Sequence, residues 1–250
     1  MDIVILTALG VGGSTIFGAV IGLICRRTNR EYNNIVMSLS AGIMLAAAFI
    51  GLIAPSIEYG GDFGVFITAI GIFSGACLVN IFDYLLKFYD FTPSFCLDSR
   101  LQVNDSVRRA LIFASAIAIH NLPEGIAAGV GFGTGEVSDG IFIATAIALQ
   151  NIPEGMAVFV ALLSVGISAG RTFILAALTG IVEIGGTFIG YFAVSACQPL
   201  LPFILALAGG SMLYIICDEL IPEARTDGSH RSTYCFLIGF ALMLVLDSFL

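Results

Sequence analysis

Residues 117–125 read Ile-Ala-Ile-His-Asn-Leu-Pro-Glu-Gly, and residues 147–155 read Ile-Ala-Leu-Gln-Asn-Ile-Pro-Glu-Gly. The same polar, proline-containing motif therefore occurs twice, and each copy lies in the middle of an apolar run. Such groups are costly inside a bilayer, where one charged side chain costs at least about 2.5–3.5 kcal/mol at the centre. Together the motifs supply an imidazole, three amides and two carboxylates, which are donor types of a divalent-metal site.

The composition predicts an integral membrane protein. Of the 250 residues, 58% are hydrophobic and 11% are charged, and the mean hydropathy is +1.01. A soluble domain of this size would need more polar surface. We expect a single domain over 1–250, because no long polar linker divides the chain. The net charge of −8 disfavours nucleic acid as a partner, and the N-terminus lacks the basic segment of a cleaved signal peptide.

Eight apolar runs are long enough to cross a bilayer core of about 30 Å, which takes about 20 helical residues. All ten Lys and Arg residues lie in, or at the edges of, the loops that follow the first, third, fifth and seventh runs. By the positive-inside rule that side is cytoplasmic, so both termini are predicted to be extracytoplasmic. The predicted spans of this all-α protein are 2–25, 35–57, 63–88, 107–131, 140–163, 171–195, 201–223 and 233–250.

The polar side chains of the two motifs are predicted to meet at one depth. His120 and Glu124 are four residues apart and share one helix face, and Gln150 and Glu154 repeat this spacing. Both motifs lie near the centres of their spans, and so does Glu183 in the sixth span. Three carboxylates at one depth repel one another unless a cation or protons compensate their charge.

Pro123 and Pro153 are predicted to kink the two motif helices. Each proline removes a backbone hydrogen bond and frees a carbonyl near the middle of the membrane. Freed carbonyls are tolerated there only against protein or a wet cavity, and interrupted helices are common at the ion sites of transporters. The alternative is a kinked helix pair whose buried polar residues only bind one another. Two motifs and Glu183 make that interpretation the weaker one.

The donor set indicates the class of ion. Imidazole, amide and carboxylate donors suit zinc, iron(II), manganese and cadmium, whereas copper(I) prefers thiolate or several thioethers. Met44 in the second span is either a soft ligand or ordinary core packing, and packing is favoured by its position. The six cysteines form no Cys-x-x-Cys pair and are interpreted as packing residues.

The second and seventh spans resemble each other, since both contain Gly-x-Met-Leu and a later Pro and Glu. They run in opposite directions through the membrane, so this similarity suggests an inverted structural repeat. Asp218, Glu219 and Glu223 lie near the cytoplasmic end of the seventh span. They either relay an ion out of the protein or are the solvated end of a helix, and the sequence favours neither.

At these residues the chain resembles the ZIP (Zrt/Irt-like) family of divalent-metal transporters, and within it the prokaryotic GufA/ZupT-like branch. The resemblance lies in the motifs at 120–125 and 150–155, in Glu183, and in Asp-Glu-Leu-Ile-Pro-Glu at 218–223. It implies a 3+2+3 arrangement, in which the fourth and fifth helices are enclosed by two inverted three-helix repeats. It also implies a homodimer in a prokaryotic plasma membrane, and alternating access by sliding of the helix 4/5 unit.

The resemblance further implies a site for two metal ions as transported substrate. The primary ion would bind His120, Glu124, Gln150 and Glu154, with Met44 as a possible further ligand. The secondary ion would bind Asn121, Asn151, Glu183 and the shared glutamates. Two features depart from the family pattern. Many relatives have His at the position of Gln150, and the His cluster often found in the cytoplasmic loop is absent, so metal sensing by that loop is not expected.

Three functions compete on these residues. The first is uptake of a divalent metal, zinc before iron, manganese or cadmium, into the cytoplasm. The second is an intramembrane metalloprotease, but the spans contain one His where His-Glu-x-x-His needs two, so no enzyme is expected. The third is a proton- or sodium-coupled carrier that uses the same glutamates without dependence on metal.

Overall fold

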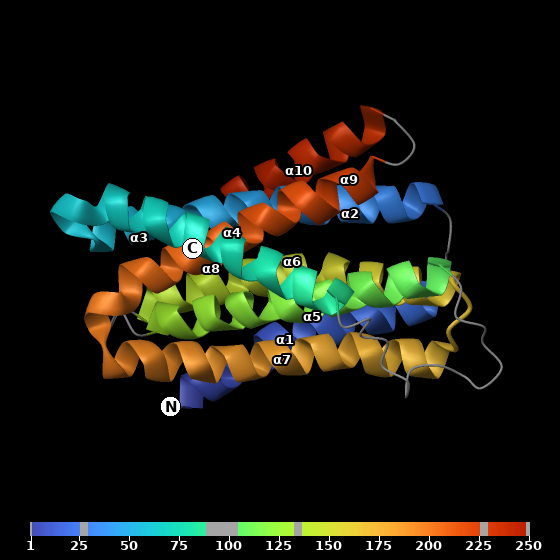
Figure 1. Cartoon of the computed structure of the whole chain (residues 1–250), viewed down its shortest axis with the longest axis horizontal. Coiled ribbons are helices and arrows are strands. Elements are labelled where there is room, and N and C mark those ends of the chain that lie inside the picture. Colours follow the sequence, from blue (N-terminus) through green and yellow to red (C-terminus); the bar gives the residue numbers. More distant parts are fainter. Residues whose placement is uncertain (1, 26–29, 89–104, 133–136, 226–229, 249–250) are drawn as a thin grey trace.

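The computed structural model describes residues 2–25, 30–88, 105–132, 137–225 and 230–248, and Figure 1 shows most helices side by side along the long axis. Throughout these residues the regular elements are helices, and no strand occurs. The α-helices are α1 (Asp2–Cys25), α2 (Arg30–Ala47), α3 (Ala54–Tyr59), α4 (Gly64–Phe88), α5 (Asp105–Gly131), α6 (Val137–Ser164), α7 (Ala169–Ala196), α8 (Leu201–Ile215), α9 (Ile221–Ala224) and α10 (His230–Asp247). The π-helical turns are η1 (Ala48–Ile53) and η6 (Ile216–Leu220), and the 3₁₀ turns are η2 (Gly61–Phe63) and η5 (Gln198–Leu200).

Every predicted span corresponds to one helical segment when α2, η1 and α3 are taken together and α8, η6 and α9 likewise. The largest difference is in the second segment, which was expected over 35–57 and extends over 30–59. Its first turn carries Arg30 and Glu31, because a helix can continue beyond the apolar layer into water. The last helix was expected to reach residue 250, but α10 ends at Asp247 and residues 249–250 lie outside the described part.

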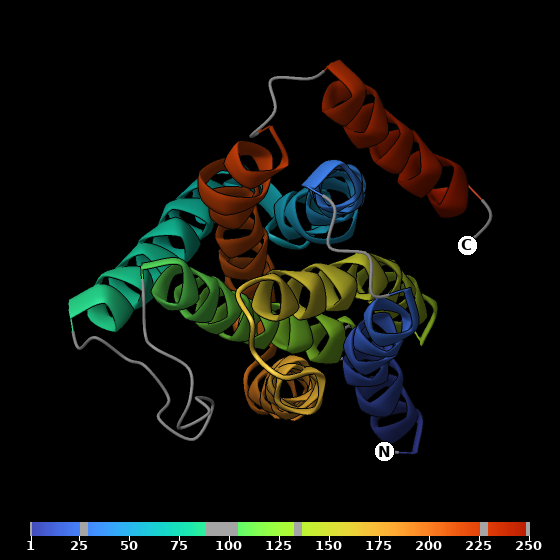
Figure 2. The same cartoon turned by 90° about the vertical axis from the view of Figure 1, so that its right-hand side faces the viewer.

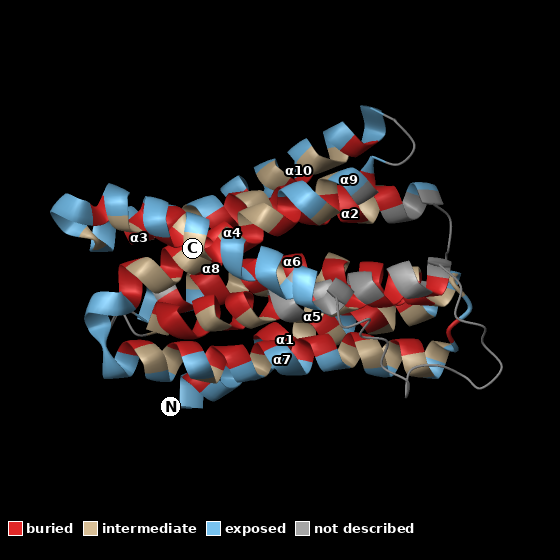
Figure 3. Cartoon of the chain, in the orientation of Figure 1, coloured by how far each residue is buried: buried red, intermediate tan, exposed pale blue. Residues whose placement is uncertain are grey.

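Large apolar side chains cover the outer surface. Ile24 is 75% exposed and Phe73 is 71% exposed, and Figure 3 shows that exposed positions gather on the outward faces of the helices. Among the described residues, six helical segments are long and apolar enough to cross a membrane. An apolar surface this extensive is unfavourable in water and favourable against lipid. The fold therefore agrees with the prediction of an all-α integral membrane protein.

The helices pack in two groups. One group contains α1, α5, α6 and α7, and the other contains α2, α4, α8 and α10. Seen along the long axis in Figure 2, α5 and α6 lie in the middle, with α1 and α7 on one side and α2, α8 and α10 on the other. Contacts of α2 with α6 and of α5 with α8 join the groups. This arrangement places the two proline motifs at the centre of the molecule.

Glycines allow the closest helix contacts within the first group. A Cβ atom on Gly125 would lie 2.1 Å from the carbonyl oxygen of Glu183, so α5 and α7 touch backbone to backbone. A Cβ atom on Gly155 would lie 2.1 Å from the carbonyl oxygen of Thr15, so α6 and α1 touch in the same way. Only a residue without a side chain fits at such positions.

The second and seventh spans share a local irregularity. A π-helical turn begins at Ala48 in one and at Ile216 in the other, in each case six residues after the glycine of Gly-x-Met-Leu. A proline, Pro55 or Pro222, stands in the α-helical turn that follows. A π-turn inserts an extra residue and rotates the rest of the helix, and such turns are frequent at functional sites.

The cysteines do not pack as the sequence suggested. Cys77, Cys197 and Cys217 are exposed, and Cys235 is half-buried. All four are free thiols, so the expectation that the cysteines pack in the protein interior is wrong for the three exposed ones. The side chains of Cys25 and Cys96 lie outside the described part of the chain.

Candidate metal site

The polar residues of α5, α6 and α7 come together in the middle of the first helix group. None of the described members is more than 2% exposed. The buried set is Asn121, Glu124, Gln150, Asn151, Glu154 and Glu183. The backbone of His120 belongs to α5 in the same turn, but its side chain is outside those that the structure describes.

The amides of each motif bind the carboxylate of the other motif. Gln150 Nε2 donates a hydrogen bond to Glu124 Oε1 and so joins α6 to α5. With its amide oriented to satisfy both groups, Asn121 donates to Glu154 Oε1 at 2.8 Å and to the carbonyl oxygen of Ile117 at 2.8 Å. The two motifs therefore face each other at one level, as their positions in the sequence predict.

Glu183 is held by side chains from two other helices. Asn151 Nδ2 on α6 donates to Glu183 Oε1, and Thr15 Oγ1 on α1 donates to Glu183 Oε2 at 3.0 Å. Thr15 is fully buried, and it was not among the predicted site residues, because one threonine in an apolar span carries no signal by itself. Its spacing to Gly18 equals that of Glu183 to Gly186, and this similarity could have identified it.

The carboxylates of Glu124, Glu154 and Glu183 are close enough to affect one another electrostatically. Glu124 interacts with the charges of Glu154 and Glu183, and Glu154 also interacts with that of Glu219. All three glutamates of the site are buried. Buried like charges repel strongly, and a bound cation is one way to compensate them.

Several oxygens of the site have no hydrogen-bond donor among the described residues. Gln150 Oε1, Asn151 Oδ1 and Glu154 Oε2 are buried and accept no hydrogen bond from the described residues. Buried oxygens of this kind are normally satisfied by a donor, water or an ion, and amide and carboxylate oxygens are ligands of divalent metals. The described side chains contain no ready-made group of three His, Cys, Asp or Glu ligands.

Three other residues that the sequence singles out are Met44, Pro123 and Pro153. Met44 is fully buried in an apolar cluster that includes Ile147 of α6 and Ala128 of α5. Its surroundings are those of a packing residue, and its role as a ligand stays a prediction. Pro123 and Pro153 lie inside α5 and α6, which continue as helices on both sides of the proline.

The carboxylates near the end of the seventh span differ in exposure. Asp218 is exposed and Glu219 is half-buried, and both belong to the π-helical turn η6. The side chain of Glu223 lies outside the described side chains. Glu219 is close enough to Glu154 for the two carboxylates to repel each other when both are ionised.

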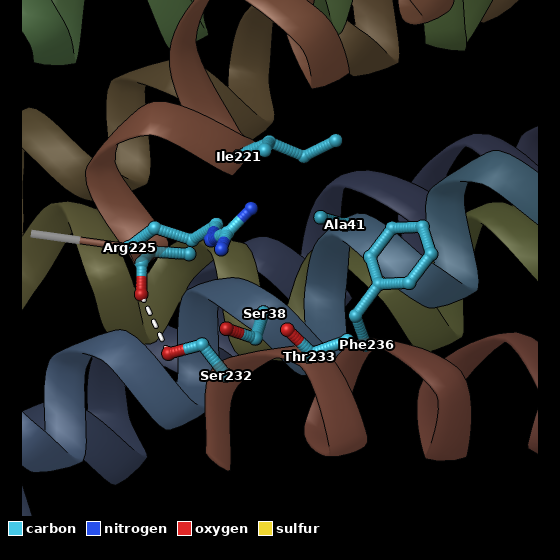
Figure 4. A pocket seen from close by; sticks show the side chains of 8 residues that line it. Ser38, Ala41, Ile221, Arg225, Ser232, Thr233 and Phe236 are labelled. Atoms are coloured by element: carbon cyan, nitrogen blue, oxygen red, sulfur yellow. Dashed lines mark hydrogen bonds between the residues drawn. The ribbon is translucent and has the colours of Figure 1, made fainter. Parts of the chain in front are cut away.

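A pocket of about 170 Å³ lies between α2, α9 and α10. Figure 4 shows the side chain of Arg225 directed into it, with Ser232 donating to the carbonyl oxygen of Ala224 at 2.7 Å. No candidate metal ligand lines this pocket, and a guanidinium repels cations. The pocket is therefore separate from the metal site. Its lining residues are Ser38, Ala41, Ile221, Ala224, Arg225, Ser232, Thr233 and Phe236.

Comparison with known proteins agrees with the chemistry of this site. The family model "ZIP Zinc transporter" matches residues 96–247. The chain is 34% identical to "Zinc transporter ZupT" of Chlorobium chlorochromatii (strain CaD3) in an alignment 244 positions long, which covers 92% of this chain and 89% of that one. It is 46% identical to "Zinc transporter GufA" of Myxococcus xanthus over 139 residues, so the alignment spans only 55% of each chain. It is also 44% identical to human "Zinc transporter ZIP11" in an alignment 150 positions long, which covers 57% of this chain and 44% of that one. This chain belongs to the ZIP family, in its prokaryotic GufA/ZupT-like branch, and is a transporter rather than an enzyme.

Proposed function

We propose that this protein moves divalent transition-metal ions, zinc first among them, into the cytoplasm through the site between α5, α6 and α7. The observation that carries the proposal is the buried cluster of Glu124, Glu154 and Glu183, with amide oxygens of the same motifs left without a hydrogen bond. When its carboxylates are ionised, this cluster carries excess negative charge, which a doubly charged ion would compensate while it also binds the unsatisfied oxygens. The relatives named as zinc transporters support zinc as the ion.

The proposed site holds two ions. The primary ion binds His120, Glu124, Gln150 and Glu154, and Met44 is a candidate further ligand. The hydrogen bond from Gln150 to Glu124 places two of these groups side by side. The secondary ion uses Glu183, Asn151 and Asn121, supported by the hydrogen bonds from Asn151 to Glu183 and from Asn121 to Glu154.

The proposed topology has eight membrane spans in a single domain over 1–250, with both termini outside a prokaryotic plasma membrane. The one-sided distribution of Lys and Arg supports this orientation. The central position of α5 and α6 supports the 3+2+3 arrangement. The matching π-turns η1 and η6 support an inverted repeat that relates the second span to the seventh.

Alternating access is proposed to move all four helices of the first group. The glycine contacts of α5 with α7 and of α6 with α1 are backbone to backbone, which supports a motion in which these four helices stay together. The contacts between the two helix groups are the proposed sliding surface. The proposed homodimer would use α4, because its span is the least buried of the six apolar spans, at 22%.

Glu219 and Asp218 are proposed to receive the ion on its way to the cytoplasm. Support comes from the electrostatic interaction between Glu219 and Glu154 and from the exposure of Asp218 at the next position. Glu223, one turn further along the helix, is the proposed last member of this relay. The π-turn η6 presents the first two of these residues together.

Uptake of radiolabelled zinc into proteoliposomes tests the proposed function. We expect uptake that saturates with zinc concentration and falls when unlabelled iron(II), manganese, cobalt or cadmium competes. Empty liposomes and denatured protein are the controls. If purified protein takes up no divalent ion, but moves protons or sodium in the absence of metal, the coupled carrier replaces the metal transporter.

The substitution Gln150→His is expected to lower the KM for zinc by about tenfold and to slow turnover. Imidazole nitrogen is a stronger ligand than an amide oxygen for borderline metals, and an ion that binds more tightly leaves more slowly. Initial rates of uptake over a range of zinc concentrations measure both quantities. An unchanged KM would show that Gln150 does not bind the transported ion.

A further inference from the structure

Helix α1 packs on α6 in the same way as α7 packs on α5. The carbonyl oxygen of Thr15 lies 2.1 Å from the position of a Cβ on Gly155, the last residue of the second motif. The carbonyl oxygen of Glu183 lies 2.1 Å from the position of a Cβ on Gly125, the last residue of the first motif. Thr15 and Glu183 are therefore in equivalent places relative to the two motifs.

The next glycine of each helix confirms this equivalence. A Cβ on Gly18, three residues after Thr15, would lie 2.1 Å from the carbonyl oxygen of Ile152. A Cβ on Gly186, three residues after Glu183, would lie 2.6 Å from the carbonyl oxygen of Leu122. Ile152 and Leu122 occupy the same position in their motifs. The two helix pairs thus match at two successive contacts, and Thr15 stands where the other pair carries the glutamate.

The hydroxyl of Thr15 has an unusual partner for a threonine in a membrane helix. Buried hydroxyls commonly donate to a carbonyl of their own helix, as Thr179 and Thr187 do on α7. Thr15 instead donates across the interface to Glu183 Oε2 at 3.0 Å, and both residues are fully buried. Asn151 binds the other oxygen of the same carboxylate, so both oxygens of Glu183 are fixed in position.

We propose that Thr15 is a positioning residue of the metal site, which orients the Glu183 carboxylate toward the ion through its hydroxyl group. If α1 carried a glutamate at position 15, as α7 does at position 183, the site would contain four carboxylates. Threonine at this position keeps the number at three. This inference rests on the proposed transport of divalent metal. It adds α1, which supplies none of the other candidate ligands, to the helices that determine how tightly the ion is held.

The test compares Thr15→Val, which keeps the side-chain shape, with Thr15→Ser, which keeps the hydroxyl. We expect Thr15→Val to weaken zinc binding and raise the uptake KM by about tenfold or more, the usual effect of losing a group that orients a metal ligand. Thr15→Ser should stay within about twofold of wild type. Calorimetric titration of zinc into purified protein and initial uptake rates measure the two effects.

Thr187→Val is the matched control. Thr187 is equally buried and its hydroxyl also binds Glu183, but at the main-chain carbonyl, 3.1 Å away, rather than at the carboxylate. We expect its zinc affinity to equal that of wild type. If Thr15→Val lowers only the melting temperature and leaves affinity and KM at the level of Thr187→Val, Thr15 is merely structural and the inference is wrong.

A second measurement keeps the inference separate from the proposed function. In a Glu183→Ala background the hydroxyl has no carboxylate to orient, so Thr15→Val should cause no further loss of zinc affinity. An equal loss in both backgrounds would overturn the positioning role. If the wild-type protein neither binds nor transports zinc, the proposed function itself has failed. If the wild type transports zinc and Thr15→Val does so with the same KM, only this inference has failed.

Discussion

Replacement of Glu124 by Gln is expected to abolish metal uptake, lowering the uptake rate by at least about 100-fold. This loss exceeds the usual effect of removing a residue that only orients a metal ligand. The substitution keeps the size of the side chain and removes one negative charge. Glu124 is fully buried and accepts a hydrogen bond from Gln150, so the variant places two neutral amides at the proposed primary site. Uptake per amount of folded protein, over a range of zinc concentrations, measures the effect.

The control for this prediction is Glu58→Gln. Glu58 is an exposed glutamate of α3, so the same change of charge occurs away from the helices that form the site. Its uptake should equal that of wild type. If the Glu124→Gln protein folds and retains more than about one tenth of wild-type uptake, Glu124 is not an essential metal ligand and the site assignment is wrong.

The second large effect is expected from Gly125→Ala. The added methyl group would lie 2.1 Å from the carbonyl oxygen of Glu183, so α5 and α7 must separate. Overpacking of this kind typically costs about 1–3 kcal/mol, and separation also moves Glu183 away from Glu124. We expect a melting temperature lower by about 5 °C and a large loss of zinc uptake.

Gly185→Ala on α7 provides the comparison. The substitution is the same and lies on α7, the helix that Gly125 of α5 contacts, but a Cβ at Gly185 would meet nothing within 4 Å. Thermal unfolding in detergent and uptake in proteoliposomes should both be close to wild type, or slightly improved because alanine favours helix. If the two alanine variants behave alike, the contact between α5 and α7 does not support the site.

Much of the candidate site could be predicted from the sequence, for reasons that are local. Glu124 and Glu154 occupy equivalent positions in two copies of one motif, and a polar group at the middle of an apolar span must face protein rather than lipid. The hydrogen bonds from Gln150 to Glu124 and from Asn121 to Glu154 agree with that expectation.

Other features required the structure. The π-turns η1 and η6 lie in spans whose similarity was visible, but the sequence does not show an inserted residue in a helical turn. The separation into two helix groups depends on where glycines meet other backbones. The close glycine contacts also motivate the proposal that four helices move together, whereas the resemblance alone implied sliding of α5 and α6.

The sequence by itself determined the membrane class, the lengths of the helical segments and the family, because hydropathy, segment length and a repeated motif are properties of continuous stretches of chain. Only the tertiary structure decided which helices surround Glu183 and that Thr15, 168 residues away in the chain, donates to its carboxylate. That contact depends on the rotation and spacing of α1 and α7 around α6. Backbone contacts at glycines set this geometry, and although the spacing of Thr15 to Gly18 repeats that of Glu183 to Gly186, the sequence does not show that the two residues meet.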